Sequence, residues 1–471
     1  MRVIVFALNG LPAGWLGAYG NDWVGTPHLD RFAAEGVTFD RHISDRPGPD
    51  AARRAWLGKH VSPTESEQTR GPVTETPLLF IGEGAGVRGS SPRTVLVRAN
   101  HPDTDAPDWF YAGWQEVFDA RPKPDDDSPL EELIRSLPAL LERLRDVPEF
   151  LLWIETDRLL PPWDVQQDVF EAYLEDTEEE PGPWPQTADG DEPESDSDEA
   201  EETDEVEELE SDEADKSEGA EEAHEPEEPT PAISETEEPE EPVEPFADPP
   251  TGPFDRADLD LWDWLHKTFA AVVTKLDAEL GAVFEILREE GLDRSAAWLI
   301  TSDFGHPLGE HGQVGLYRPW LHEELVHLPL LLRLPNAEQA GRRVSGFTQP
   351  PDLFPTLLEL FGLAPPAGTP GHSLLPAARG LSESPRASAI TQLELGGAAE
   401  IALRTGEWSL IVPTLVPEGD PPREPQLYEK PDDRWEVNDL RGRNVERADE
   451  LEALLREEIQ KAKQQTAGDA N

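Results

Sequence analysis

The chain has 471 residues, which is enough for one large α/β domain and a smaller one. It contains no cysteine, so a disulfide framework and a cysteine nucleophile are both excluded. The formal net charge of −60 disfavours nucleic acid as a partner, because binding phosphates requires clustered Lys and Arg side chains. No run is long and apolar enough to span a bilayer, and a predicted strand begins directly after Met1, so we expect a cytoplasmic protein with no membrane partner.

Apolar runs alternate with helical patterns along most of the chain, which is typical of an α/β fold with a mostly parallel sheet. The predicted strands cover residues 3–8, 77–81, 94–98, 150–154, 296–300 and 328–333, and the predicted helices cover residues 26–36, 51–57, 130–144, 258–291 and 351–362. Further runs at 390–394, 401–404 and 408–412 alternate like strands of an antiparallel sheet, and a terminal helix is predicted at 448–461.

The middle of the chain is dominated by Glu, Asp, Pro and Ser. Between Glu175 and Asp248 there are 35 acidic residues and one lysine, Lys216. Such a segment cannot bury enough apolar surface to offset the entropy lost on ordering, so we predict a disordered insertion at residues 175–253. The alternative is an acidic segment that buffers metal ions or binds a partner. The other predicted parts are an α/β domain made of residues 1–174 and 254–385, a C-terminal α+β subdomain at 386–463, and a frayed tail at 464–471.

Two oxygen-bearing side chains follow predicted strands of the sheet. Asn9 comes directly after the strand at 3–8, and Asp303 comes shortly after the strand at 296–300. Because open α/β sheets bind ligands outside the carboxyl ends of their strands, these two side chains are candidates for one ligand site. The structural alternative for Asp303 is that it caps the turn that follows it.

Three segments carry a resemblance to a known family. The opening VIVFALNGLPAGWLGAYGNDWVGTPHLDRFAAEGVTFDRHIS resembles the amino-terminal signature of the sulfatases, SDFGHPLGEHG resembles their second signature, and LYEKPDDRWEVNDL resembles a segment near their carboxyl terminus. The resemblance implies the fold of the alkaline-phosphatase-like superfamily, an α/β sandwich with a central, mostly parallel sheet between helices. It also implies a small C-terminal antiparallel α+β subdomain.

The resemblance further implies a sulfate-ester site with a divalent metal, Ca²⁺ by analogy with the family, held by oxygen ligands. Asn9 and Asp303 match two metal-ligand positions of the family, whereas Phe304 replaces another. The side chains that match or lie near positions of the family's basic frame are Arg53, Lys59, His311 and Arg318. Each has a structural alternative, as a solvated helix charge for Arg53 and Lys59 and as a satisfied structural histidine for His311.

The chain departs from the family motifs at the centre of the expected reaction. Pro49 takes the place of the Cys or Ser nucleophile, so formylglycine cannot form, and Glu155 replaces a histidine. One hypothesis is therefore a sulfuric ester hydrolase with an altered site, in which Asp50 acts as metal ligand or nucleophile. The other is a catalytically inactive protein that has lost the metal and binds an anionic small molecule, a sulfated carbohydrate or a protein partner. The sequence carries no indication of the oligomeric state.

Overall fold

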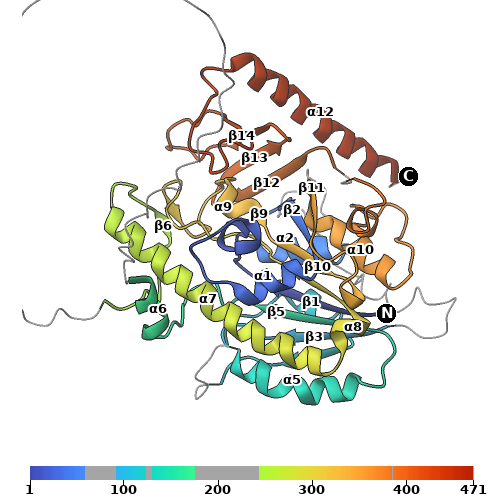
Figure 1. Cartoon of the computed structure of the whole chain (residues 1–471). Helices are drawn as coiled ribbons and strands as arrows, with labels where there is room; N and C mark the ends of the chain where they lie inside the picture. Colours follow the sequence, from blue (N-terminus) through green and yellow to red (C-terminus); the bar gives the residue numbers. More distant parts are fainter. Residues whose placement is uncertain (59–91, 124–129, 175–242, 384–385, 470–471) are drawn as a thin grey trace, which may run out of the picture. The chain divides into compact units, whose positions relative to one another are not determined.

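The computed structural model describes residues 1–58, 92–123, 130–174, 243–383 and 386–469 (Figure 1). Met1–Glu175 and Glu244–Asn471 make up one compact unit. The predicted strand at 77–81, the candidate residue Lys59 and most of the predicted insertion lie outside the described residues. Within the described ranges, no helix is long and apolar enough to cross a membrane.

A nine-stranded sheet forms the centre of this unit (Figure 1). Its strands lie in the order β11-β2-β10-β7-β1-β5-β3-β4, and β9 pairs with β2. They are β1 (Arg2–Leu8), β2 (Val37–Ile43), β3 (Arg93–Arg98), β4 (Glu116–Asp119), β5 (Phe150–Thr156), β7 (Ala296–Thr301), β9 (His327–Leu328), β10 (Leu330–Arg333) and β11 (Arg342–Thr348). Only β9 and β10 run antiparallel to their neighbours in this sheet. The predicted, mostly parallel central sheet is confirmed.

Helices cover both faces of this sheet, so the side chains of β1 alternate between two cores. Ile4 and Phe6 pack on the face covered by α1, α5 and α7, whereas Val3, Val5 and Ala7 pack on the face covered by α2 and α10. The helices are α1 (Pro27–Ala34), α2 (Pro49–Trp56), α4 (Asp108–Tyr111), α5 (Glu131–Leu144), α6 (Gln167–Leu174), α7 (Leu259–Glu289), α8 (Leu292–Ser295), α9 (Glu323–Val326), α10 (Leu353–Leu360) and α11 (Leu375–Ala378). The predicted sandwich is therefore confirmed.

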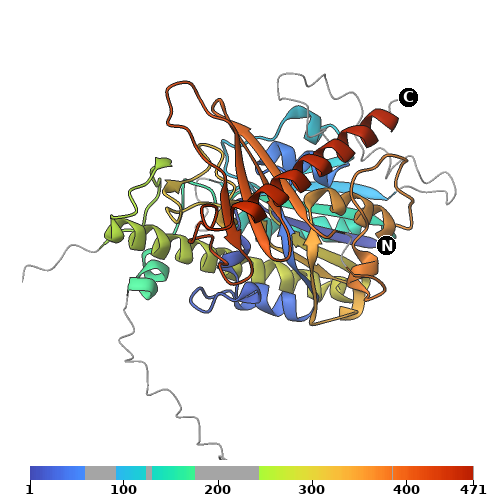
Figure 2. The same cartoon turned by 90° about the horizontal axis from the view of Figure 1, so that it is seen from above.

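A four-stranded antiparallel sheet forms the C-terminal subdomain, in the order β12-β13-β14-β15. Its strands are β12 (Ala389–Leu395), β13 (Ala398–Arg404), β14 (Trp408–Leu415) and β15 (Gln426–Glu429). Helix α12 (Val445–Asp469) packs Leu451 and Leu455 against Leu403 and Leu410, and Figure 2 shows it lying across these strands. The predicted antiparallel α+β subdomain is confirmed. The helix continues to Asp469, through residues that were predicted to be frayed.

The chain rejoins the folded unit earlier than the predicted end of the insertion at residue 253. Phe246 stacks on Trp264 with ring centroids 4.0 Å apart, and the Ala247 carbonyl accepts a hydrogen bond from Trp163 N at 2.6 Å. Strand β6 (Gly252–Pro253) then pairs with β8 (Gln313–Val314). The acidic composition concealed this anchor, because Phe246 is one of few apolar residues in the segment and its aromatic contact is with a distant helix.

A buried charged cluster joins the C-terminal subdomain to the α/β domain. Glu436 accepts hydrogen bonds from Arg404 at 3.1 Å and from His322 at 3.0 Å. The His311 ring stacks on that of His322 at 3.8 Å, with Nδ1 2.8 Å from Glu324 Oε1 and Nε2 3.0 Å from the Glu436 carbonyl. Burial disfavours a charged ring, but the hydrogen bonds to Glu324 and Glu436 and the charges of these two carboxylates together outweigh burial and raise the pKa of His311 to about 9. His311 is therefore a cation at neutral pH.

Gly305 marks a point where the loop after β7 runs against the backbone of α9. Its N–H donates to the Leu325 carbonyl at 2.8 Å, and a Cβ here would overlap the Glu324 carbonyl oxygen. We expect Gly305→Ala to lower the free energy of unfolding by about 3 kcal/mol in equilibrium urea unfolding. Gly442→Ala is the control, because a Cβ there meets no atom within 4 Å. Equal stability of the two variants would contradict this packing.

The charge of His311 leads to a prediction about pH. Because its pKa is raised from 6.5 to about 9, its stabilisation is complete below pH 6.5 and is lost as the pH rises through 9. We expect the wild type to lose about 1–3 kcal/mol of unfolding free energy over this interval and His311→Gln to lose less. Urea unfolding at a series of pH values measures both.

Glu310 is still present in the His311→Gln variant, and its ionisation also makes the protein less stable as the pH rises. Burial, with the charge of Glu324, raises its pKa to about 8, so its ionisation also lowers stability as the pH rises. His372→Gln is the control, since the side chain of His372 is 63% exposed. If His311→Gln keeps the full pH dependence of the wild type, the assignment of that dependence to His311 is wrong.

Candidate functional site

The carboxyl ends of β1, β5 and β7 meet at one edge of the central sheet, as the sequence predicted for β1 and β7. Asn9 follows β1, Glu155 lies near the end of β5, Asp303 follows β7, and Arg53 comes from α2. All four residues are at most 5% exposed. We call Asn9, Arg53, Glu155 and Asp303 the strand-end cluster.

The local sequence explains how α2 delivers Arg53 to this edge. Gly48 precedes the helix with a φ of 129°, in a region that favours glycine, and Pro49 occupies the first turn, where no helical hydrogen bond needs its N–H. The helix then buries Ala52, Arg53 and Trp56. The arginine is therefore carried inward on the buried face of α2.

Arg53 forms a buried ion pair with Glu155. Its Nε donates to Glu155 Oε1 at 2.8 Å, and its Nη2 donates to the same oxygen. Asn9 Nδ2 also donates to this oxygen at 3.2 Å, and the guanidinium lies 5.1 Å from the centre of the Phe110 ring. The positive charge of Arg53 is thus matched by a carboxylate of the protein itself.

Asp303 is completely buried beside this pair. Its Oδ1 accepts hydrogen bonds from Gly10 N at 3.0 Å and Phe304 N at 2.9 Å. Burial raises the pKa of Asp303 to about 7, although the bond from Gly10 and the charge of Arg53 act to lower it. The bond to Phe304 N means that Asp303 does hold the turn that follows it, which was the structural alternative.

Two oxygens of the cluster are available to a cation. Asn9 Oδ1 and Asp303 Oδ2 are buried and have no hydrogen-bond partner among the described residues. A calcium ion takes about six to eight oxygen ligands, and in the part of the chain that the structure describes no group of three His, Asp or Glu side chains is placed to hold a metal. The donor set therefore does not fit the metal that the family resemblance implies.

Asp50 lies in the first turn of α2, where its carboxylate already has partners. Oδ2 accepts from Arg54 Nε at 2.8 Å and Oδ1 accepts from Trp109 Nε1 at 3.1 Å. The side chain is 34% exposed, in contrast to the buried strand-end cluster. The carboxylate of Asp50 therefore lies at the surface, bonded to Arg54 and Trp109, and not within the strand-end cluster.

The other two described candidates lie toward the C-terminal subdomain. His311 belongs to the charged cluster at the joint, in contact with Glu324 and Glu436. Arg318 lies 4.4 Å from the centre of the Trp320 ring, and its charge acts on the buried carboxylate of Glu400 in β13. Neither forms a described hydrogen bond with the strand-end cluster.

His306 and Asp45 also carry side chains of the types that bind metals. His306 is 4% exposed between Phe269 and Trp163, and burial lowers its pKa to about 4. Burial raises the pKa of Asp45 to about 6, with the charges of Arg46 and Arg386 acting against it. The described hydrogen bonds link neither residue to Asn9 or Asp303.

The role of Glu155 in this cluster was not predicted. The sequence showed it only as a replacement for a family histidine at the end of an apolar run. A carboxylate within a strand that is buried along its whole length requires a cationic or hydrogen-bonding partner, and this signal was available in the sequence. Its partner, Arg53, lies 102 positions away, which no local pattern indicates.

Comparison with known proteins shows partial similarity to the sulfatases. A family model described as "Sulfatase" matches residues 186–363. Arylsulfatase K of Bos taurus is 35% identical over 109 residues, which are 23% of this chain and 20% of that protein. PehA of Trinickia caryophylli, a multifunctional alkaline phosphatase superfamily protein, is 33% identical over 113 residues, 24% of this chain and 22% of that protein. This chain thus spans about a fifth of the length of these two curated relatives.

Solved structures match over nearly the whole chain. A protein solved with its substrate D-glucosamine-2-N,6-O-disulfate superimposes with a TM-score of 0.66 at 16% identity, covering 99% of this chain and 98% of that one. The phosphonate monoester hydrolase of Agrobacterium radiobacter gives a TM-score of 0.63 at 15% identity, with 98% and 95% covered. At such identities the likeness concerns the fold. Together with the motifs, the partial family match makes this chain similar to the sulfatases, and the solved structures show that it shares their fold.

Proposed function

We propose that this chain is a non-hydrolytic member of the sulfatase family. The observation that carries the proposal is the pairing of Arg53 with Glu155, in which Nε and Nη2 both donate to one buried carboxylate oxygen. A sulfate ester that reacts at this edge needs cationic donors directed at its own oxygens, because such donors stabilise the charge that develops in the transition state. In this protein Arg53 donates to Glu155 instead, so these donors are not directed at a sulfate ester.

The position of the missing nucleophile supports the same proposal. Pro49 carries no nucleophilic atom, and the carboxylate of Asp50 is bonded to Arg54 and Trp109. A covalent mechanism requires a nucleophile that is activated by a base or a metal and aimed at the ester. A carboxylate that is already bonded to Arg54 of its own helix and to Trp109 of α4 does not meet this requirement.

A metal-dependent hydrolase with an altered site is the second candidate. It is favoured by the two buried oxygens without partners, Asn9 Oδ1 and Asp303 Oδ2, since buried polar atoms usually have a bonding partner. In this candidate both oxygens bind a divalent cation and Asp50 acts as the nucleophile. The two candidates differ in their response to metal ions, which makes them separable by experiment.

Hydrolysis and metal dependence are tested together on the full chain. The substrates are 4-nitrophenyl sulfate, 4-nitrophenyl phosphate, an aryl phosphonate monoester, and D-glucosamine-2-N,6-O-disulfate, with which a structural neighbour was solved. We expect no turnover, and a melting temperature that neither excess EDTA nor millimolar Ca²⁺ or Mg²⁺ changes by more than about 1 °C. The melting temperature is preferred to metal content, because the acidic middle segment would bind cations without stabilising the fold.

Asp303→Asn separates the outcomes. Its amide oxygen can still accept from Gly10 and Phe304, so under the proposal the variant is as stable as the wild type or more stable. Asp263→Asn, at an exposed carboxylate of α7, is the matched control. Turnover or stabilisation by metal that disappears in Asp303→Asn and persists in Asp263→Asn would establish the second candidate instead.

A double-mutant cycle tests the pairing of Arg53 with Glu155. We expect Arg53→Met and Glu155→Met each to lower the free energy of unfolding by about 3–5 kcal/mol, because each leaves a buried charge unpaired. The double variant recovers part of this loss, with a coupling energy of about 2–3 kcal/mol measured by urea unfolding. The exposed pair Arg447–Glu450 is the control, with an expected coupling below about 0.5 kcal/mol. Additive losses at Arg53 and Glu155 would show that the arginine is free to bind a ligand.

A further inference from the structure

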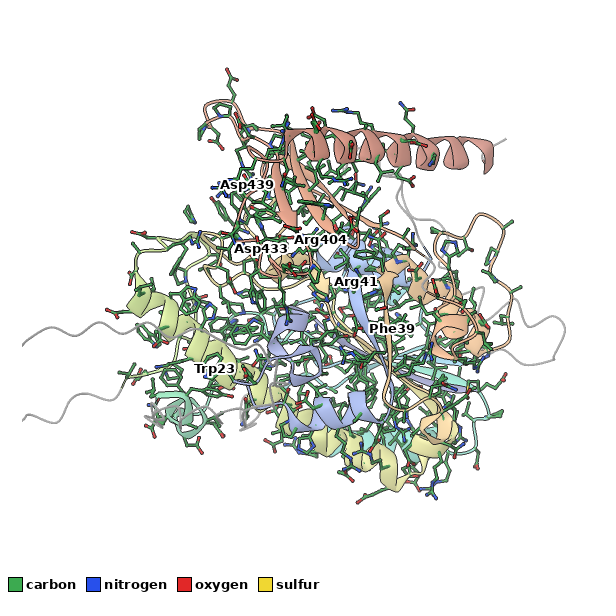
Figure 3. The ribbon with its side chains drawn as sticks, turned by 45° about the horizontal axis from the view of Figure 1, so that its top comes forward. Trp23, Phe39, Arg41, Arg404, Asp433 and Asp439 are labelled. Carbon is green, nitrogen blue, oxygen red and sulfur yellow. The ribbon has the colours of Figure 1, made fainter. Side chains whose placement is uncertain are left out.

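A second site is suggested by a cavity of about 270 Å³ between strands β2 and β11 of the central sheet and the C-terminal subdomain. Its cationic lining residues are Arg41, Arg343, Arg404, Lys430 and Arg434. Figure 3 shows Arg404 above Arg41 where the two parts of the molecule meet. No residue of the strand-end cluster lines this cavity. It is therefore a separate feature from the site described above.

The charge of this cavity is opposite to that of the protein. Five cationic side chains face two carboxylates, Asp40 and Glu323, in a chain with a formal net charge of −60. Asp40 pairs with Arg343 at 2.5 Å, and Glu323 pairs with Lys430 at 3.0 Å. Arg404 pairs with Glu436 at 3.1 Å, so Arg41 and Arg434 leave an excess of positive charge.

Two of these arginines have only neutral partners. Arg41 Nε donates to the Ser345 carbonyl at 2.5 Å, and Arg434 Nη2 donates to the Tyr19 carbonyl at 2.8 Å. Their guanidinium groups also lie 4.6 Å and 4.7 Å from the ring centres of Phe347 and Trp435. In the described part of the chain neither forms an ion pair with a carboxylate. Their charge is therefore available to a ligand.

Arg404 contributes buried donors that the protein leaves unused. Its side chain is 3% exposed, and Nη2 donates to the Leu321 carbonyl at 2.6 Å and to Glu436 Oε1 at 3.1 Å. Nε and Nη1 have no hydrogen-bond partner within the described residues, although Glu323 Oε1 lies 3.6 Å from Nε. Buried donors without acceptors are unfavourable, so the joint beside the cavity has fewer acceptors than donors at Arg404.

We propose that this cavity binds a small organic anion, with an oxyanion head group among the arginines and an apolar body. Guanidinium groups match the paired oxygens of carboxylates and phosphates. The apolar lining comes from Tyr19, Ile43, Phe347 and Pro431. The cavity is smaller than the pockets of about 300–1,000 Å³ that take drug-sized ligands, so the ligand has about the size of a substituted benzene ring. This proposal is independent of whether the strand-end cluster catalyses a reaction.

Isothermal titration of the full chain with phenyl phosphate and with benzoate tests the proposal. We expect one of these aromatic anions to bind with a Kd below about 1 mM at low salt, and to bind more weakly as salt is added. The head group that binds more tightly distinguishes a phosphate from a carboxylate ligand. Inorganic phosphate and neutral benzyl alcohol should each bind at least about tenfold more weakly, because the first lacks the apolar ring and the second lacks the anionic head group. If neither phenyl phosphate nor benzoate binds at 5 mM, the proposal is wrong.

Variants locate the bound anion. Arg41→Gln and Arg434→Gln should each weaken binding about tenfold, and both are expected to fold because these side chains bond only to neutral groups. Arg31→Gln, a change at an exposed arginine of α1, should leave the affinity within about twofold. Melting curves verify that each variant is folded.

The variant Arg53→Met with Glu155→Met separates this site from the strand-end cluster. It should bind phenyl phosphate or benzoate as the wild type does. If it abolishes binding while Arg41→Gln and Arg434→Gln do not, the anion occupies the strand-end cluster and the proposal is wrong. That result would also contradict the matching of Arg53 by Glu155 on which the proposed function rests, whereas a cavity that binds nothing would leave the proposed function untouched.

Discussion

The buried ion pair of Arg53 and Glu155 determines what the carboxyl edge of the central sheet can do. A charge within a fully buried strand is tolerated only when a partner of opposite charge is held against it. The pair ties α2 to β5, and the bond from Asn9 extends it to the end of β1. An edge that open α/β sheets commonly leave to ligands is thereby occupied by contacts within the protein.

A closed cluster and an open cavity differ in how their charges are matched. In the strand-end cluster one carboxylate oxygen receives donors from Arg53 and Asn9, so little positive charge is left for an incoming anion. In the cavity beside β2, the hydrogen bonds that Arg41 and Arg434 form with described residues go to carbonyl oxygens. The two regions therefore have opposite suitability for an anionic ligand, although both contain arginine.

The joint between the α/β domain and the C-terminal sheet connects the cavity to the stability of the fold. Arg404 lines the cavity and bonds to Glu436, which also accepts from His322 in the charged cluster. A buried network of this kind is favourable only when most of its donors and acceptors are matched. His311 in the same network is a cation at neutral pH and loses this charge at alkaline pH. The joint therefore weakens as the pH rises.

The sequence by itself determined the architecture, because the patterns involved are local. Apolar runs located β1, β3, β5, β7 and β10, but not β2, β4 and β11, which mix charged and apolar residues. The buried face of α7 contains Leu265, Phe269 and Leu280, and the family motifs implied the sandwich. That the ends of β1 and β7 meet also followed from the sequence, since parallel strands of one sheet end at the same edge.

Only the tertiary structure decided how the charges are matched. The partner of Arg53 comes from another strand, and the cations of the cavity come from β2, β11, β13 and the segment after β15. Phe246 anchors residues that looked disordered because its contact with Trp264 depends on the folded position of α7. Local sequence specifies which residues are polar or charged, but their partners are set by contacts between distant segments, which no periodicity encodes.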